Sequence, residues 1–123
     1  MHGGGKAEKS YIHAQDLSRA ILSVIERAPL GKVYNVGPKE STSIREVVRL
    51  VSDACSVPFD SLVEEAPDRM GQDQRYLLNS SAIERDCGWQ QTISLPQGIE
   101  RVVQWVKKFP ELLTYSTEYQ HRL

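Results

Sequence analysis

Three short polar motifs predict where three of the helices of this chain begin. In each motif a serine is followed three residues later by Glu or Gln, so the serine hydroxyl accepts a backbone N–H and the longer side chain returns to the serine N–H. The motifs pair Ser43 with Glu46, Ser81 with Glu84, and Ser94 with Gln97. They predict three helices, and the first and last continue as apolar stripes at helical spacing: Ile44, Val47, Val48, Val51 and Ala54, then Ile99, Val102, Val103 and Val106.

A further helix is predicted at 14–27, with Asp16 in its first turn or as its N-cap. Apolar residues at helical spacing form one face of this helix: Leu17, Ala20, Ile21, Val24 and Ile25. Gly88 is expected as a left-handed C-cap, Trp89 as a core residue, and Pro110 as the break in the last helix.

Short strands complete the expected order of elements, at 10–13, 32–36, 62–64 and 75–78. Strands and about four helices alternate, which indicates a small α/β or α+β domain. We expect one domain over residues 1–108, followed by a tail at 109–123.

Composition excludes several classes of protein. The 123 residues carry a net charge of −1, without the basic excess of a non-specific nucleic-acid binder. Cys55 and Cys87 have no Cys-x-x-Cys spacing, so we expect reduced core thiols in a cytoplasmic protein. The three histidines show no metal-ligand spacing, and no apolar run approaches the roughly 20 residues of a membrane span.

The polar segment 67–76 is the strongest candidate for a binding site. It places Arg69 and Arg75 on either side of Gly71, and the planar guanidinium suits bidentate contacts to phosphate oxygens. Two explanations stay open for the arginines. They grip a diphosphate across the turn, or they pair with Asp68 and Asp73 inside the loop.

Two further polar residues carry weaker signals. Asn35 lies in the middle of an apolar stretch, so its amide either ties a neighbouring loop or faces a ligand. Lys9 precedes an aromatic segment and is either a solvent-exposed lysine or an anion contact. No Gly-x-Gly-x-x-Gly follows a strand, and no Ser, Cys or His stands in a nucleophile–base setting.

Taken in order, these segments resemble a known family. The chain is similar to the C-terminal part of the extended short-chain dehydrogenases/reductases that act on nucleotide-sugars, and closest to the dTDP-glucose 4,6-dehydratase group. The resemblance runs through Gly5-Lys6, Tyr11 and Asp16, then Tyr34-Asn35-Val36-Gly37, Asp68-Arg69-Met70-Gly71-Gln72-Asp73-Gln74-Arg75-Tyr76, Gly88-Trp89 and Gly98-Ile99. The stretch from Asp68 to Tyr76 is the most specific.

The resemblance implies a role for each matching residue in a small substrate-binding lobe. Arg69 is expected to contact the diphosphate of a nucleotide-sugar, with Arg75 supporting the same loop and Asn35 approaching the ligand. Lys9 and Gln72 stand where the family often has Arg and His. A lysine cannot make the bidentate contact that an arginine makes. A glutamine keeps an N–H donor but, unlike histidine, has no ionisable group.

Catalysis in the family also requires parts that this chain does not show. The resemblance implies NAD on a Rossmann lobe together with a Tyr-x-x-x-Lys pair, so we expect no cofactor site in this chain and no turnover by it alone. The expected function is a substrate-binding fragment of an NAD-dependent dehydratase, a lyase. The alternatives are a stand-alone binding module that self-associates through exposed apolar surface, and a fragment of a 4-epimerase.

Overall fold

The chain forms a small α+β structure, as the sequence predicts. The computed structural model describes residues 1–114, without the side chain of Leu112, so most of the expected tail lies outside the described residues. Five α-helices, one antiparallel strand pair and two 3-10 turns make up the described part. They are α1 (Ala14–Arg27), α2 (Ile44–Cys55), α3 (Phe59–Leu62), α4 (Ser81–Cys87), α5 (Leu95–Lys108), β1 (Glu8–Lys9), β2 (Thr42–Ser43), Gly3–Gly5 and Pro110–Thr114.

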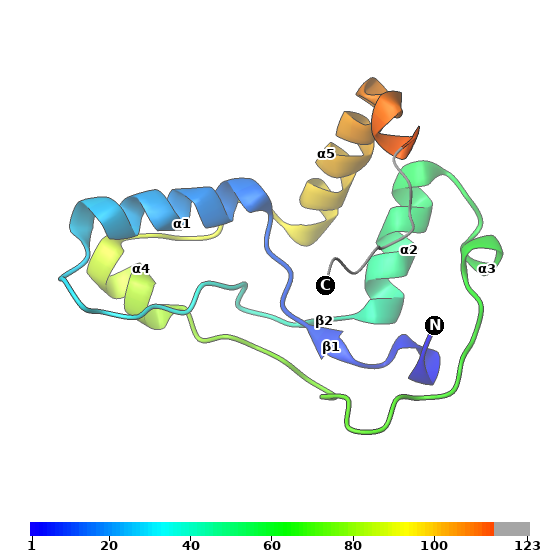
Figure 1. The fold of residues 1–123 in the computed structure, drawn as a ribbon, viewed down its shortest axis with the longest axis horizontal. Coiled ribbons are helices and arrows are strands. Elements are labelled where there is room, and N and C mark those ends of the chain that lie inside the picture. The colour runs from blue at the N-terminus through cyan, green and yellow to red at the C-terminus, as the bar shows by residue number, and fades with distance from the viewer. Residues whose placement is uncertain (115–123) are drawn as a thin grey trace, which may run out of the picture.

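The helices form two groups that long connections join (Figure 1). Helix α1 packs against α4 at one end of the molecule, and α2 packs against α5 at the other. The β1–β2 pair lies between them, beside the start of α2. Within the described residues, none of the helices has both the length and the apolar character needed to cross a bilayer.

Helix ends follow the predicted caps at most positions. Ser43 accepts the Glu46 N–H at 3.1 Å, and the box at Ser94 and Gln97 is complete in both directions. Helix α1 has the predicted bounds, and Gly88 takes the left-handed conformation at φ 66°. The box expected at Ser81 is wrong, because Ser81 is already inside α4 and its N–H donates to Asn79 Oδ1 at 2.9 Å.

The strand predictions are wrong at all four positions. Residues 10–13, 32–36 and 62–64 hold no strand, and Arg75 contributes only an isolated bridge to Glu8. A strand requires a partner for its backbone groups. Residues 32–36 form no backbone hydrogen bond with any other described residue, so the alternation of side chains alone does not produce a strand there.

The core lies between α1, α4 and the segment after α4. It contains Ala20, Ile83, Cys87 and Trp89, with Trp89 only 3% exposed, as predicted. The core covers only part of the apolar face of α1, because Leu17, Ile21 and Ile25 are 40%, 53% and 74% exposed. They lie four residues apart along one side of the helix, which α4 does not cover.

A buried carboxylate connects α1 to the start of α5. Asp16 is fully buried and its two oxygens accept from the Thr92 and Ile93 amides, the Thr92 hydroxyl and Arg19. Burial raises the pKa of Asp16, but these hydrogen bonds and the Arg19 charge together hold that pKa below its ordinary value of 3.8. The ionised carboxylate therefore stabilises the fold.

Replacement of this carboxylate is expected to destabilise the protein strongly. Asp16→Asn places amide hydrogens opposite backbone donors, and we expect a loss of about 3 kcal/mol in the free energy of unfolding. Urea unfolding checks this, with Asp53→Asn as the control because Asp53 is exposed on α2.

The difference between the parent and Asp16→Asn should depend on pH. Because the pKa of Asp16 is lower in the folded state, its contribution is complete above pH 4 or so and disappears as the pH falls through the folded-state pKa. The two proteins should converge in stability below about pH 4. A difference that grows on acidification contradicts this account.

Candidate functional site

The 67–76 loop is attached at both of its ends to the first nine residues of the chain. At the start of the loop, the Gly3 N–H donates to Ala66 O at 3.2 Å. At the end, the Glu8 N–H donates to Gln74 O at 2.8 Å and the Tyr76 N–H donates to Glu8 O at 3.0 Å. The residues between these anchors form the projecting loop below β1 in Figure 1.

The centre of the loop is a tight turn. The Gln72 N–H approaches Arg69 O at 3.4 Å, and Gly71 has φ 77°, a conformation that favours glycine. Met70 is fully exposed at the tip, and Gln72 is half-buried beneath it. The glycine therefore shapes the turn that separates Arg69 from Arg75.

Each arginine of the loop has a partner from another segment. Arg69 Nη2 lies 3.1 Å from His2 Nε2, while Asp68 Oδ1 accepts the Arg69 backbone N–H at 2.9 Å. Arg75 Nε donates to the Glu8 carboxylate at 3.1 Å and to Ser41 Oγ at 3.0 Å. Among the described residues, neither arginine pairs with Asp68 or Asp73 through its side chain, so the expected pairing inside the loop is wrong.

Lys9 reaches the same loop from β1. Its Nζ donates to the backbone oxygen of Asp73 at 3.1 Å, and Lys9 is only partly exposed. The structure thus places Lys9 and Arg75 together at one end of the turn and Arg69 at the other. This part of the chain presents three cationic side chains around one loop.

Asn35 is not part of this group. It is exposed on the segment between α1 and Gly37, and that segment lies beside α4. The Tyr34 hydroxyl donates to Asp86 of α4 at 3.2 Å, and Gly37 exchanges hydrogen bonds with the Ser80 hydroxyl. No hydrogen bond joins Asn35 to the described residues of the loop.

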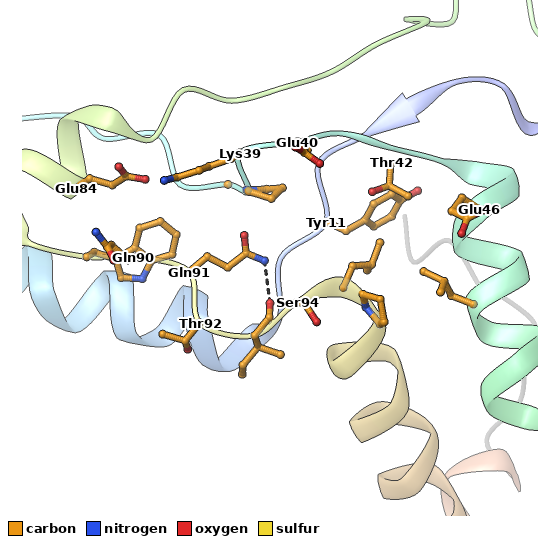
Figure 2. Close-up of a pocket in the computed structure, with 17 residues that line it drawn as sticks. Tyr11, Lys39, Glu40, Thr42, Glu46, Glu84, Gln90, Gln91, Thr92 and Ser94 are labelled. Carbon is orange, nitrogen blue, oxygen red and sulfur yellow. Dashed lines mark hydrogen bonds between the residues drawn. The ribbon is translucent and has the colours of Figure 1, made fainter.

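A cavity of about 650 Å³, which no sequence motif indicated, also occurs among the described residues. It lies between residues 37–42 and 89–96 and ends at α2 and α4 (Figure 2). Lys39 extends toward Glu84 across one end, and Gln91 Nε2 donates to Ile93 O at 2.8 Å along the floor. Besides Lys39, its ionised side chains are the carboxylates of Glu40, Glu46 and Glu84, so it does not suit an anion.

The described residues offer little acid–base or metal chemistry. Burial and a hydrogen bond to Asp86 raise the pKa of Tyr34 to about 12, and burial raises the pKa of Tyr11. Both phenols therefore stay protonated near neutral pH. Residues 1–114 contain no group of three His, Cys, Asp or Glu side chains that could hold a metal ion.

Comparisons with known proteins place the chain in a class. No family model matches it. Its fold matches UDP-glucose 4-epimerase of Thermotoga maritima with a TM-score of 0.80 at 23% identity, over 89% of this chain and 35% of the other. It also matches dTDP-glucose 4,6-dehydratase of Streptomyces venezuelae, solved with NAD and TYD bound, with a TM-score of 0.81 at 28% identity, over 90% and 34%. The chain therefore resembles about a third of the extended short-chain dehydrogenases/reductases.

Within that family, the sequence is related to the dehydratases. The chain is 33% identical to dTDP-glucose 4,6-dehydratase of Streptomyces griseus over 108 residues, which are 88% of this chain and 33% of that enzyme. The resemblance inferred from the motifs is confirmed. The chain spans about a third of the length of the relatives it matches.

Substitution of Gly71 is expected to strain the turn. An alanine at φ 77° meets no atom within 4 Å, so the cost is conformational, about 1 kcal/mol in the free energy of unfolding. Gly31 is the matched control, because it has φ 78° and equally open space far from the loop. Thermal unfolding of Gly71→Ala and Gly31→Ala should give equal losses, and only the first should shift the amide resonances of residues 69–75.

Proposed function

We propose that this chain is the substrate-binding lobe of a nucleotide-sugar 4,6-dehydratase and grips the diphosphate of its substrate. The observation that carries the proposal is the anchored 67–76 loop, which holds Arg69, Arg75 and Lys9 around the Gly71 turn. Guanidinium groups held in this way suit the closely spaced oxygens of a diphosphate. The relatedness to dTDP-glucose 4,6-dehydratases supports the choice of ligand class.

The three cations take different parts in this proposal. Arg69 carries the main contact to the diphosphate, because its guanidinium forms a hydrogen bond only with His2 among the described side chains of residues 1–114. Arg75 shares its Nε with Glu8 and Ser41, so it mainly fixes the loop. Lys9 adds positive charge, Gln72 contributes a neutral donor below the turn, and Asn35 approaches the sugar or base from the 32–36 segment.

The cofactor of the dehydration step is a separate part of this proposal. The chain has no glycine-rich dinucleotide fingerprint, and its cationic loop follows no strand that opens into a helix. We therefore assign NAD, which the solved relative binds, to another part of the complete enzyme.

The uncovered side of α1 supports this assignment. Leu17, Ile21 and Ile25 form an apolar strip, and Leu30 and Val33 beyond it are 102% and 91% exposed. Contiguous apolar surface of this kind indicates a protein interface. We infer that a cofactor-binding lobe covers the strip, and that a second copy of this chain covers it when that lobe is absent.

Binding of a nucleotide-sugar should depend on Arg69. Loss of a charge-assisted contact predicts at least about tenfold weaker binding of dTDP-glucose to Arg69→Ala, measured by calorimetry. Arg85→Ala is the control, because Arg85 is exposed on α4 and pairs with Asp86. Equal affinity of Arg69→Ala and the parent, or no binding by the parent, refutes the proposal for this chain.

Self-association should depend on the apolar strip. Ile25→Lys places a charge on the most exposed of its three α1 residues and should shift the isolated chain toward monomer in sedimentation experiments. Glu26→Gln, which also changes the net charge by +1 at an exposed neighbouring position, is the control for the change in charge. Identical sedimentation of the parent and Ile25→Lys would show that the strip does not mediate association.

A further inference from the structure

We propose that His2 is a positioning residue for Arg69. Its imidazole restrains the guanidinium at the 69–72 turn and so prepares it for an anionic oxygen. The role of this restraint in binding rests on the proposed function. The restraint itself is a property of the ligand-free chain.

The two contacts of the imidazole require one and the same tautomer. His2 Nδ1 lies 2.8 Å from Pro67 O, and a carbonyl oxygen only accepts, so Nδ1 carries the proton. His2 Nε2 then has a free lone pair, and it lies 3.1 Å from Arg69 Nη2, which only donates. The neutral ring with hydrogen on Nδ1 satisfies both partners at once.

The backbone around His2 holds the ring in place. His2 forms a parallel bridge with Ala66, whose N–H donates to Met1 O at 2.9 Å, and the Met1 ammonium donates to Glu64 O. Gly3 has φ 54°, and a Cβ there would lie 2.6 Å from the Asp68 carboxylate. The close approach of residues 1–3 and 64–68 therefore depends on the glycine after His2.

Arg69 is consequently held at both ends. Asp68 Oδ1 accepts its backbone N–H, and His2 accepts one hydrogen of its guanidinium. Arginine has five N–H donors, so four remain for phosphate oxygens. A side chain that is already ordered loses less rotamer entropy on binding, which increases affinity without any new contact to the ligand.

The first experiment is nuclear magnetic resonance of the ligand-free chain. In the parent we expect slowed rotation of the Arg69 guanidinium. His2→Phe keeps a ring but has no lone pair, and should show free rotation. His2→Gln supplies an oxygen acceptor and should restore slow rotation. Free rotation in the parent, or slow rotation in His2→Phe, overturns the proposal.

The second experiment measures dTDP-glucose binding by calorimetry at pH 8. Loss of one neutral hydrogen bond predicts that His2→Phe binds about three- to tenfold more weakly, with His2→Gln closer to the parent. In an Arg69→Ala background, His2→Phe should have no further effect. If the losses of affinity caused by His2→Phe and Arg69→Ala add up in the double variant, the positioning role is overturned.

The two experiments also distinguish this inference from the proposed function. A parent chain with a restrained Arg69 but no affinity for dTDP-glucose refutes the proposed function and retains the His2–Arg69 restraint. A parent chain that binds through a freely rotating Arg69 refutes the restraint alone. Thermal unfolding of each His2 variant confirms that the fold is retained.

Discussion

The fold depends on the burial of one ionised carboxylate. A charge in the interior is costly unless every lone pair has a donor, so α1 can lie only where the Thr92 and Ile93 amides reach Asp16. The Trp89 indole adds a second connection by donating to the Asp16 backbone oxygen at 3.0 Å. Together they fix the segment between α4 and α5 against α1, and so relate the two groups of helices.

Helices were predictable from the sequence because their signals are local. The box at Ser94, the left-handed Gly88 and the apolar spacing of α1 each act within a few residues. Strands were not predictable, because pairing depends on what lies alongside. Val33 and Tyr34 have strand-like side chains, yet no described segment pairs with their backbone, while Glu8 and Lys9 form β1 with little strand character of their own.

The candidate site was likewise predictable only in part. The loop and its cations were visible in the sequence, because Arg69, Gly71 and Arg75 lie within seven positions. The partners that orient them were not visible, since His2, Glu8 and Ser41 come from distant segments that only the fold brings near. The cavity beside Lys39 had no motif at all, because its walls are connecting segments.

The pairing of the first residues with the 64–76 segment has a kinetic consequence. The Ser10–Tyr76 and His2–Arg69 contacts join positions 66 and 67 residues apart. Closing so long a stretch of chain costs entropy before any contact compensates it. The hydrogen bonds inside helices α1 and α2 join residues that are close in the sequence, so these helices can form early in folding. The arginine loop acquires its shape only when the two distant segments meet, which makes it a late product of folding.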